Sequence, residues 1–170
     1  QTMAGTWYAI YTNPRSEKSA HRALLEKGIH AYLPLVKTLK QWSDRKKMVE
    51  EPLFRSYLFV NVTKAEYIKV LNTPGVVRYI TFEGKAVPIP QNQIDAIKYF
   101  LETEVPDEEG LTGFAPGALV EVTRGTLMGL RGTLVEERGR HRVKVVIEAI
   151  GKSIAITIPK SGLRKIVINE

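Results

Sequence analysis

The sequence predicts an α+β protein of two domains: an α/β sandwich with a mainly antiparallel sheet and three helices, then a small β-barrel. Residues 5–103 alternate short apolar strands with three segments of helical spacing. Residues 114–170 contain short runs of β-branched residues separated by glycines and charges, which are typical of a small barrel. Between them, residues 104–113 ("EVPDEEGLTG") are acidic and without periodicity, which predicts a flexible linker.

The first strand and the first helix follow from the start of the chain. The apolar segment "TWYAIYT" (6–12) predicts a strand. Asn13 can cap a helix whose first position is Pro14, and Gly28 can close that helix. We expect the buried stripe of this helix to consist of Ala20, Ala23 and Leu24.

The rest of the first domain alternates in the same way. "HAYLPLVKTL" (30–39) predicts a strand interrupted by a proline, and the polar stretch "KQWSDRKKMVEE" (40–51) predicts a hairpin arm. Thr63 and Glu66 have the spacing of a capping box, which starts a second helix. "VVRYI" (76–80) is the next expected strand. A third helix is predicted by the spacing of Ile94, Ile97 and Leu101.

The strand "RSYLFVNV" (55–62) has two faces of different character. Successive side chains of a strand point to opposite faces, so one face carries Leu58, Val60 and Val62. If that face lies in the core, Tyr57 and Phe59 on the other face need a different partner.

The second domain differs from the first in its pattern of short β-branched runs. Four strands are expected, in "ALVEV", "GTLVEE", "RVKVVIE" and "SIAITIP". Their strand alternation is good and their helical periodicity is poor, so we expect a stable barrel that does not refold as helices. Gly125, Gly129 and Gly132 punctuate a strand–loop–strand passage, where positive φ or close backbone approach is expected.

Composition and charge narrow the class of function. The net charge is +7, with +6 in residues 1–103, −4 in residues 104–113 and +5 in residues 114–170. Two basic domains suggest a polyanionic partner. The absence of cysteine excludes disulfides and thiolate metal sites, and no apolar run approaches the ~20 residues that cross a bilayer. We expect a cytoplasmic monomer with no membrane partner.

Catalytic interpretations find little support. His21, His30 and His141 are far apart in sequence, and we expect no metal and no cofactor. "RGTLMGLRGT" lacks the Gly-Lys-Ser/Thr ending of a phosphate-binding loop, and Ser56 lacks the surrounding pattern of a nucleophile elbow. The sequence therefore argues against an enzyme.

Three basic groups are candidates for binding nucleic acid. The first is a ridge on the first helix, and the second is the tip of the arm; a charged, solvated surface is the alternative for each. Their residues are Arg15, Lys18 and Arg22, with His21 as a stacking side chain, and Arg45, Lys46 and Lys47. In the second domain, "RGRHRVK" offers Arg138, Arg140, Arg142 and Lys144 as an RNA-binding hairpin, or simply a charged one.

Two parts of the chain resemble known families. "VEVTRGTLMGLRGTLVE" resembles a KOW motif, the strand–loop–strand element of small SH3-like barrels that ribosomal proteins and translation factors also carry. "WYAIYTNPRSEKSAHRALLEKGI", "PLFRSYLFVNV" and "NTPGVVRYI" resemble, in order and spacing, the amino-terminal (NGN) domain of the NusG family of transcription elongation factors. The resemblance runs from about Trp7 to Val167. "EPLFRSYLFV" and "QWSDRKKMVEEPLF" are most similar to specialised antiterminators such as RfaH and the UpxY-type proteins.

This resemblance implies a function. Phe54, Tyr57 and Phe59 match the family's aromatic strand, which receives the clamp helices of the largest catalytic subunit of RNA polymerase. The helix ridge would contact the non-template DNA strand, and the barrel would recruit a ribosomal protein or Rho. The start of the second helix, "KAEYIK", departs from the antiterminators that read a DNA hairpin, so that specificity is not implied. The alternative is an RNA-binding, ribosome-associated KOW protein.

Overall fold

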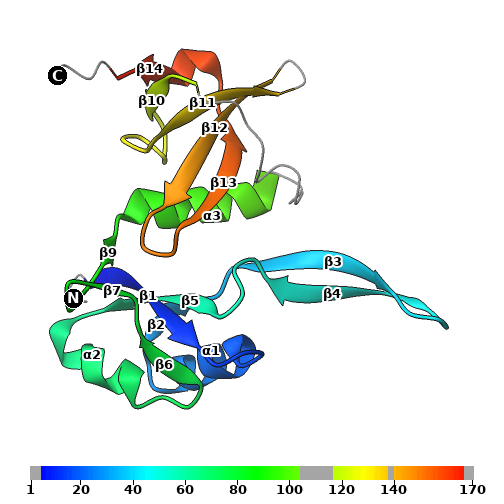
Figure 1. Cartoon of the computed structure of the whole chain (residues 1–170), viewed down its shortest axis with the longest axis vertical. Coiled ribbons are helices and arrows are strands. Elements are labelled where there is room, and N and C mark those ends of the chain that lie inside the picture. The colour runs from blue at the N-terminus through cyan, green and yellow to red at the C-terminus, as the bar shows by residue number, and fades with distance from the viewer. Residues whose placement is uncertain (1–4, 104–116, 138–139, 167–170) are drawn as a thin grey trace. The chain divides into compact units, whose positions relative to one another are not determined.

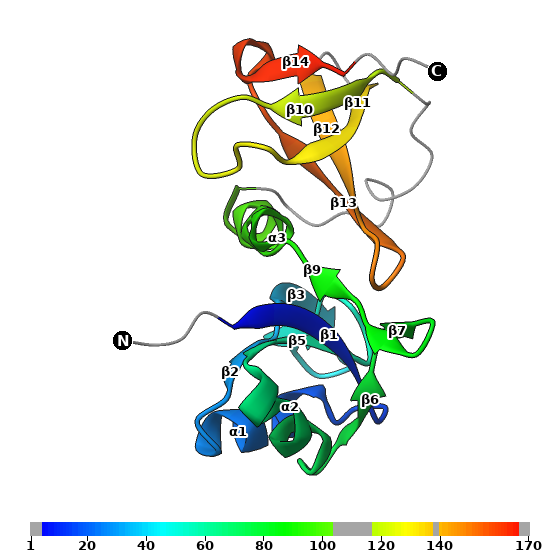
Figure 2. The same cartoon turned by 90° about the vertical axis from the view of Figure 1, so that its left-hand side faces the viewer.

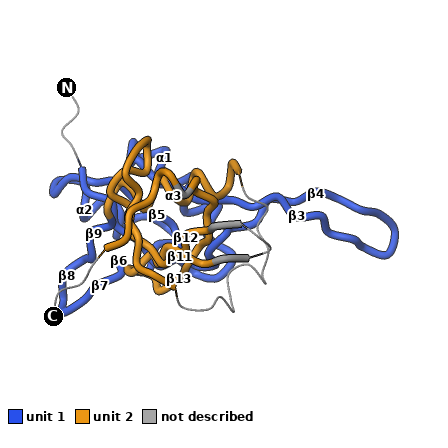
Figure 3. Tube along the Cα trace, turned by 90° about the horizontal axis from the view of Figure 1, so that it is seen from above, with its two compact units in different colours: residues 1–89 blue, residues 90–170 orange. Residues whose placement is uncertain are grey.

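The computed structural model describes residues 5–103, 117–137 and 140–166. The chain divides into two compact units, residues 1–89 and residues 90–170, which are shown in different colours in Figure 3. None of the helices among the described residues is both long and apolar enough to cross a bilayer.

The first unit is built on an antiparallel sheet with two helices on one face (Figures 1 and 2). The sheet has the order β2-β5-β1-β6, and a short strand β9 also pairs with β1. Its strands are β1 (Thr6–Thr12), β2 (His30–Tyr32), β5 (Tyr57–Val62), β6 (Val76–Tyr79) and β9 (Pro88–Ile89). The two helices are α1 (Glu17–Glu26) and α2 (Lys64–Leu71).

Two hairpins leave this sheet. The longer one pairs β3 (Leu35–Gln41) with β4 (Lys46–Pro52), and Figure 3 shows it extending away from the rest of the first unit. We call it the arm. The shorter one pairs β7 (Thr81–Phe82) with β8 (Lys85–Ala86). The predicted interruption at Pro34 and the predicted hairpin are both found.

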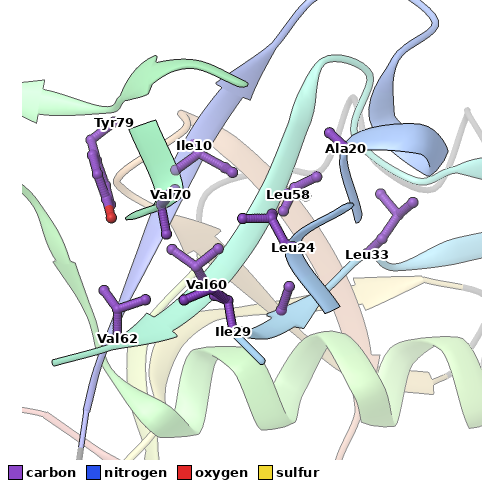
Figure 4. Close-up of a cluster of buried hydrophobic side chains, with 11 residues drawn as sticks. Ile10, Ala20, Leu24, Ile29, Leu33, Leu58, Val60, Val62, Val70 and Tyr79 are labelled. Carbon is purple, nitrogen blue, oxygen red and sulfur yellow. The ribbon is translucent and has the colours of Figure 1, made fainter. Parts of the chain in front are cut away.

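The core of the first unit lies between the sheet and its two helices (Figure 4). Leu58, Val60 and Val62 point into it, which confirms the predicted face of β5. They pack with Ala20 and Leu24 of α1, both completely buried. The sheet face opposite α1 and α2 is therefore the one that carries Tyr57 and Phe59.

The start of α1 differs from the prediction. The helix begins at Glu17 rather than Pro14, with Ser16 in the capping position. Arg15 has a φ of 63°, a left-handed conformation that cannot continue into a right-handed helix. The Ser16 amide donates to the Asn13 carbonyl oxygen at 3.0 Å, so residues 13–16 form a turn before the helix.

The other helix boundaries agree with the sequence. Gly28, at a φ of 78°, follows the end of α1 as predicted. The amide of Thr63 donates to the Glu66 carboxylate at 3.0 Å, which is half of the predicted capping box at the start of α2. In α3 (Gln91–Thr103), Ile94 and Ile97 are buried as predicted, whereas Phe100 takes the buried position expected for Leu101.

The second unit contains an antiparallel sheet of order β13-β12-β11-β10-β14, shown in Figure 2. The strands are β10 (Leu119–Val122), β11 (Arg131–Glu137), β12 (Arg140–Ile147), β13 (Lys152–Thr157) and β14 (Leu163–Lys165), with a short 3₁₀ turn, η2 (Lys160–Gly162), before β14. All four predicted strands are present. Among the described residues β13 and β14 are the two ends of an open path, so the strand pairing does not close the expected barrel.

Helix α3 belongs to the second unit, whereas we expected it in the first domain. It contacts β12 and β13, and the Tyr99 hydroxyl donates to the Thr157 carbonyl oxygen at 3.1 Å. Helical spacing alone predicts a buried stripe but not the sheet that covers it, and the domain bounds 5–103 and 114–170 stay predictions. The linker expected at residues 104–113 lies outside the described residues.

Candidate functional site

Aromatic side chains cover the sheet face opposite α1 and α2. Residues directly opposite one another in an antiparallel pair point to the same face, and the register pairs Tyr11 with Tyr57, and Phe59 with Tyr32. Phe54 reaches the same group from the loop before β5, with its ring 6.3 Å from that of Phe59. We call this surface the aromatic face; its members are Trp7, Tyr11, Tyr32, Phe54, Tyr57 and Phe59.

The centre of the aromatic face is buried. Phe59 has an exposed fraction of 0% and Phe54 of 4%. Phe59 is held edge-to-face by Phe54 and stacked on Tyr32 at 6.4 Å between ring centroids. Of the three residues proposed for polymerase contact, these two therefore support the face from within rather than forming its outer surface.

Tyr57 lies at the more exposed end of the aromatic face. Its ring meets that of Tyr11 at 5.8 Å in an edge-to-face arrangement, and both side chains are half-buried. The Arg78 guanidinium lies 5.8 Å from the Tyr11 ring centroid. Rigid aromatics with polar tips are common in protein interfaces because they contribute large contact areas at small entropic cost. Tyr57 is thus the predicted contact residue that a partner reaches first.

The basic ridge is exposed but is not one continuous helix face. Lys18 and Arg22 lie on α1, whereas Arg15 lies in the turn before it; all three are exposed. His21 differs from them, because its Nε2 is 3.2 Å from the Ala31 carbonyl oxygen and its ring is half-buried. That hydrogen bond ties the imidazole to β2, so His21 is poorly placed to stack on a base.

A groove of about 710 Å³ is lined by residues of the start of α1, of the arm and of the loop before β5. It is lined by Pro14, Arg15, Glu17, Lys18, Lys40, Trp42, Val49, Glu50, Glu51, Pro52, Arg55 and Ser56. Glu17 is buried, and its carboxylate accepts the Ser56 amide at 3.2 Å. The Ser56 carbonyl in turn accepts the Thr12 amide at 2.8 Å. These two bonds fix Ser56, which has a φ of 66°, and with it the position of Arg55 on the groove floor.

Three positively charged side chains lie near the Glu51 carboxylate in this groove. Lys40 and Glu51 form an ion pair of 2.6 Å across the arm. The hydrogen bond from Lys40 lowers the pKa of the Glu51 carboxyl, and the charges of Arg55 and Lys18 add to that effect. Burial acts against it. The groove therefore contains positive side chains close to the Glu51 carboxylate, and Glu17 and Glu50 also line it.

Both faces of the arm carry charged side chains, and its tip is basic. Arg45, Lys46 and Lys47 at the tip are exposed, as a nucleic-acid contact requires. Leu39 and Met48 are directly opposite each other in the register, and both are more than half exposed. Trp42 lies on the other face.

The glycines singled out in the second unit have backbone roles. Gly125 and Gly129 have φ values of 82° and 89°, which other residues rarely adopt. A Cβ at Gly132 would lie 2.5 Å from the Lys144 carbonyl oxygen, so that position permits close strand approach.

The basic hairpin of the second unit is only partly described. The Arg142 guanidinium donates to the Ala155 carbonyl oxygen at 2.8 Å, a cross-strand contact within the sheet, and Lys144 on the same strand is half-buried. Arg138 and the side chain of Arg140 lie outside the described residues. Within residues 5–103, 117–137 and 140–166, no three His, Cys, Asp or Glu side chains lie close enough together to hold a metal ion.

Sequence reasoning missed part of both surfaces. Tyr11 and Tyr32 were not singled out, although the alternation of "TWYAIYT" places Trp7, Ala9 and Tyr11 on one face. Trp42 belongs to the polar stretch that predicts the arm, and no local pattern marks it as a groove residue. That residues of the arm and of the start of α1 line one groove depends on tertiary structure.

Comparison with known proteins agrees with this architecture. The family model described as "Transcription termination factor nusG" matches residues 5–98. A structure of NusG from Thermotoga maritima matches with 22% identity and a TM-score of 0.51, covering 95% of this chain and 97% of that one. Two conformations of an MjSpt4:Spt5 complex also match, at 14% and 16% identity and TM-scores of 0.32. They cover 94% and 96% of this chain, and 97% and 99% of theirs, a likeness too distant to support further conclusions.

Proposed function

Because the chain belongs to the NusG family of transcription factors, we propose that it is a transcription elongation factor that binds RNA polymerase through its aromatic face. The observation that carries the proposal is the Tyr11–Tyr57 pair. Its rings are half-buried, 5.8 Å apart, and lie on the sheet face that α1 and α2 leave uncovered. Phe54 and Phe59 behind them keep this surface rigid.

The proposed contact is with the clamp helices of the largest catalytic subunit. Tyr57 would insert its ring between helix side chains and keep its hydroxyl at the polar rim. A bridge that binds the closed clamp better than the open clamp shifts the population toward the closed state. Elongation then becomes more processive and pausing is suppressed. No catalytic step by the factor is required.

The basic residues would guide the non-template DNA strand. Arg15, Lys18 and Arg22 are exposed at and beside the start of α1, and exposed cations bind phosphates without reading sequence. Arg45 and its two neighbouring lysines on the arm would add a second contact. Arg55 in the groove and Tyr57 on the aromatic face are two residues apart, so one short segment would connect the DNA contact to the polymerase contact.

The second unit would act as the coupling module. We propose that its sheet is an SH3-like KOW barrel that recruits a further partner, a ribosomal protein or Rho, and that the whole chain is an operon-specific antiterminator of the UpxY type. The strand–loop–strand passage with Gly125, Gly129 and Gly132 supports the KOW assignment.

A single-round transcription assay tests this function. Elongation complexes of a matched bacterial RNA polymerase are halted, released, and followed through a template with pause sites, with and without the full chain. We expect shorter pauses when the chain is present. The outcome against the proposal is an unchanged pause lifetime at concentrations of the chain well above those at which other factors of the family act.

A further inference from the structure

We propose that Trp42 is a base-stacking residue, and that the groove between α1 and the arm holds one or two nucleotides of a single DNA strand. The inference rests on the proposed function, which brings non-template DNA to α1. It adds a residue outside the helix ridge and assigns the groove a ligand.

Trp42 is exposed yet fixed in place. Its exposed fraction is 45%, whereas the other tryptophan, Trp7, is 4% exposed. The Trp42 amide donates to the Arg45 carbonyl oxygen at 2.8 Å, which closes the turn of the arm. The Arg45 guanidinium lies 5.9 Å from the indole ring centroid, within the range of a cation–π contact. An indole held this way loses little freedom when a flat ligand stacks on it.

The groove that Trp42 lines also contains positively charged side chains, which can bind the phosphates of a nucleic-acid backbone. Arg15 and Lys18 line it from the start of α1, and Arg55 lines it from the loop before β5. All three are exposed. Three acids also line it: Glu17 accepts the Ser56 amide, Glu51 pairs with Lys40, and Glu50 is exposed. Cations that track a backbone beside an aromatic platform are the usual composition of a site for single-stranded nucleic acid.

Single-stranded DNA fits this site better than duplex DNA. The faces of bases in a duplex are covered by their neighbours, whereas an unpaired base exposes a π-face on which an indole can stack. Trp42 lies on the face of the arm that also carries Lys40 and Val49, and all three line the groove.

The test is a titration of the full-length chain with oligothymidine roughly 12 nucleotides long, at low salt. Trp42 and Trp7 are the chain's two tryptophans. Stacking should therefore quench the emission of Trp42 saturably and leave that of buried Trp7 unchanged. We expect Trp42→Ala to remove the quenching and to weaken binding of labelled oligothymidine by about 5- to 150-fold. Trp42→Phe, which retains a stacking ring, should keep most of the affinity.

Leu39→Ala is the matched control, because Leu39 is 57% exposed on the same arm but on its other face. It should bind like the wild type. Binding by Trp42→Ala as tight as that of Leu39→Ala would overturn the proposal. Binding of duplex DNA or of oligouridine tighter than that of oligothymidine, or no binding of the wild-type chain, would overturn it as well.

The assay contains no polymerase, so it separates the two proposals. A chain that shortens pauses but binds oligothymidine independently of Trp42 refutes the stacking role alone. Trp42-dependent binding by a chain that leaves pausing unchanged supports the stacking role and refutes the proposed function alone.

Discussion

Glu17 is the side chain on which the geometry of the groove depends most directly. It is the first residue of α1, has an exposed fraction of 6%, and accepts the Ser56 amide at 3.2 Å. Replacing it with alanine leaves the Ser56 amide without its acceptor and releases the loop that places Arg55. We therefore expect Glu17→Ala to destabilise the first unit and to loosen the groove.

The magnitude follows from two contributions of Glu17. A hydrogen bond from a buried amide to a carboxylate contributes about 1.5–3 kcal/mol to the free energy of unfolding. A negative charge in the first turn of a helix adds about 0.3–1 kcal/mol. Glu17→Ala should thus lower the free energy of unfolding of the first unit by about 2–4 kcal/mol. Glu17→Gln keeps an acceptor oxygen but loses the charge, so its loss should be about half as large.

Urea unfolding followed by tryptophan fluorescence measures this loss. Both tryptophans lie in the first unit, so the signal reports on that unit of the full chain. With a urea dependence of about 1–3 kcal/mol per molar, the midpoint for Glu17→Ala should fall by about 0.7–4 M. Glu26→Ala is the control, because Glu26 is exposed in the last turn of the same helix, where a negative charge gives no stabilisation.

The order of the urea midpoints tests whether Glu17 holds the loop that contains Ser56. We expect the midpoint to decrease from wild type and Glu26→Ala, through Glu17→Gln, to Glu17→Ala. If Glu17→Ala and Glu26→Ala unfold at the same urea concentration, the bond from Ser56 does not hold the loop, and the account of how Arg55 is positioned is refuted.

Two predictions concern the second unit. Gly132→Ala should lower the free energy of unfolding of this unit by about 1–3 kcal/mol or more, because the new Cβ would meet the Lys144 carbonyl oxygen at 2.5 Å. Denaturation followed by circular dichroism measures this loss. A variant as stable as the wild type would contradict the prediction. Hydrogen bonds from Arg164 and Arg131 hold the pKa of Glu121 below its ordinary value of 4.5. The stabilisation by Glu121 should be complete above that value and be lost as the pH falls through the lower, folded-state pKa, so Glu121→Gln should flatten the acid limb of a stability–pH profile.

Local structure was predictable wherever a short pattern has one physical solution. The capping box of α2 depends on Thr63 and Glu66, three residues apart, and the core face of β5 depends on simple alternation. Gly28 ends α1 as its position indicates. In each case the determining contact lies within one turn or one strand, so sequence spacing contains the needed information.

What could not be predicted depends on contacts between distant segments. The late start of α1 follows from the left-handed Arg15 and from bonds that join residues 12 and 17 to residue 56. The contact of α3 with β12 and β13 depends on the sheet that covers its buried stripe. The groove depends on residues of the arm and of the start of α1 that are far apart in sequence. None of these is encoded in a local period, and the place of Trp42 in the groove lining could not be predicted for the same reason.

We propose that the aromatic face binds RNA polymerase, and the dissociation constant of the full chain for core polymerase tests this contact. Tyr57→Ala should raise Kd about 30-fold or more, the effect of losing a central aromatic contact. Ile68→Ala, which removes a 59% exposed side chain from α2, should leave it unchanged. A polymerase that lacks its clamp helices should bind as weakly as Tyr57→Ala does. Equal Kd values for Tyr57→Ala and the wild type, with undiminished binding to the truncated polymerase, would contradict the account.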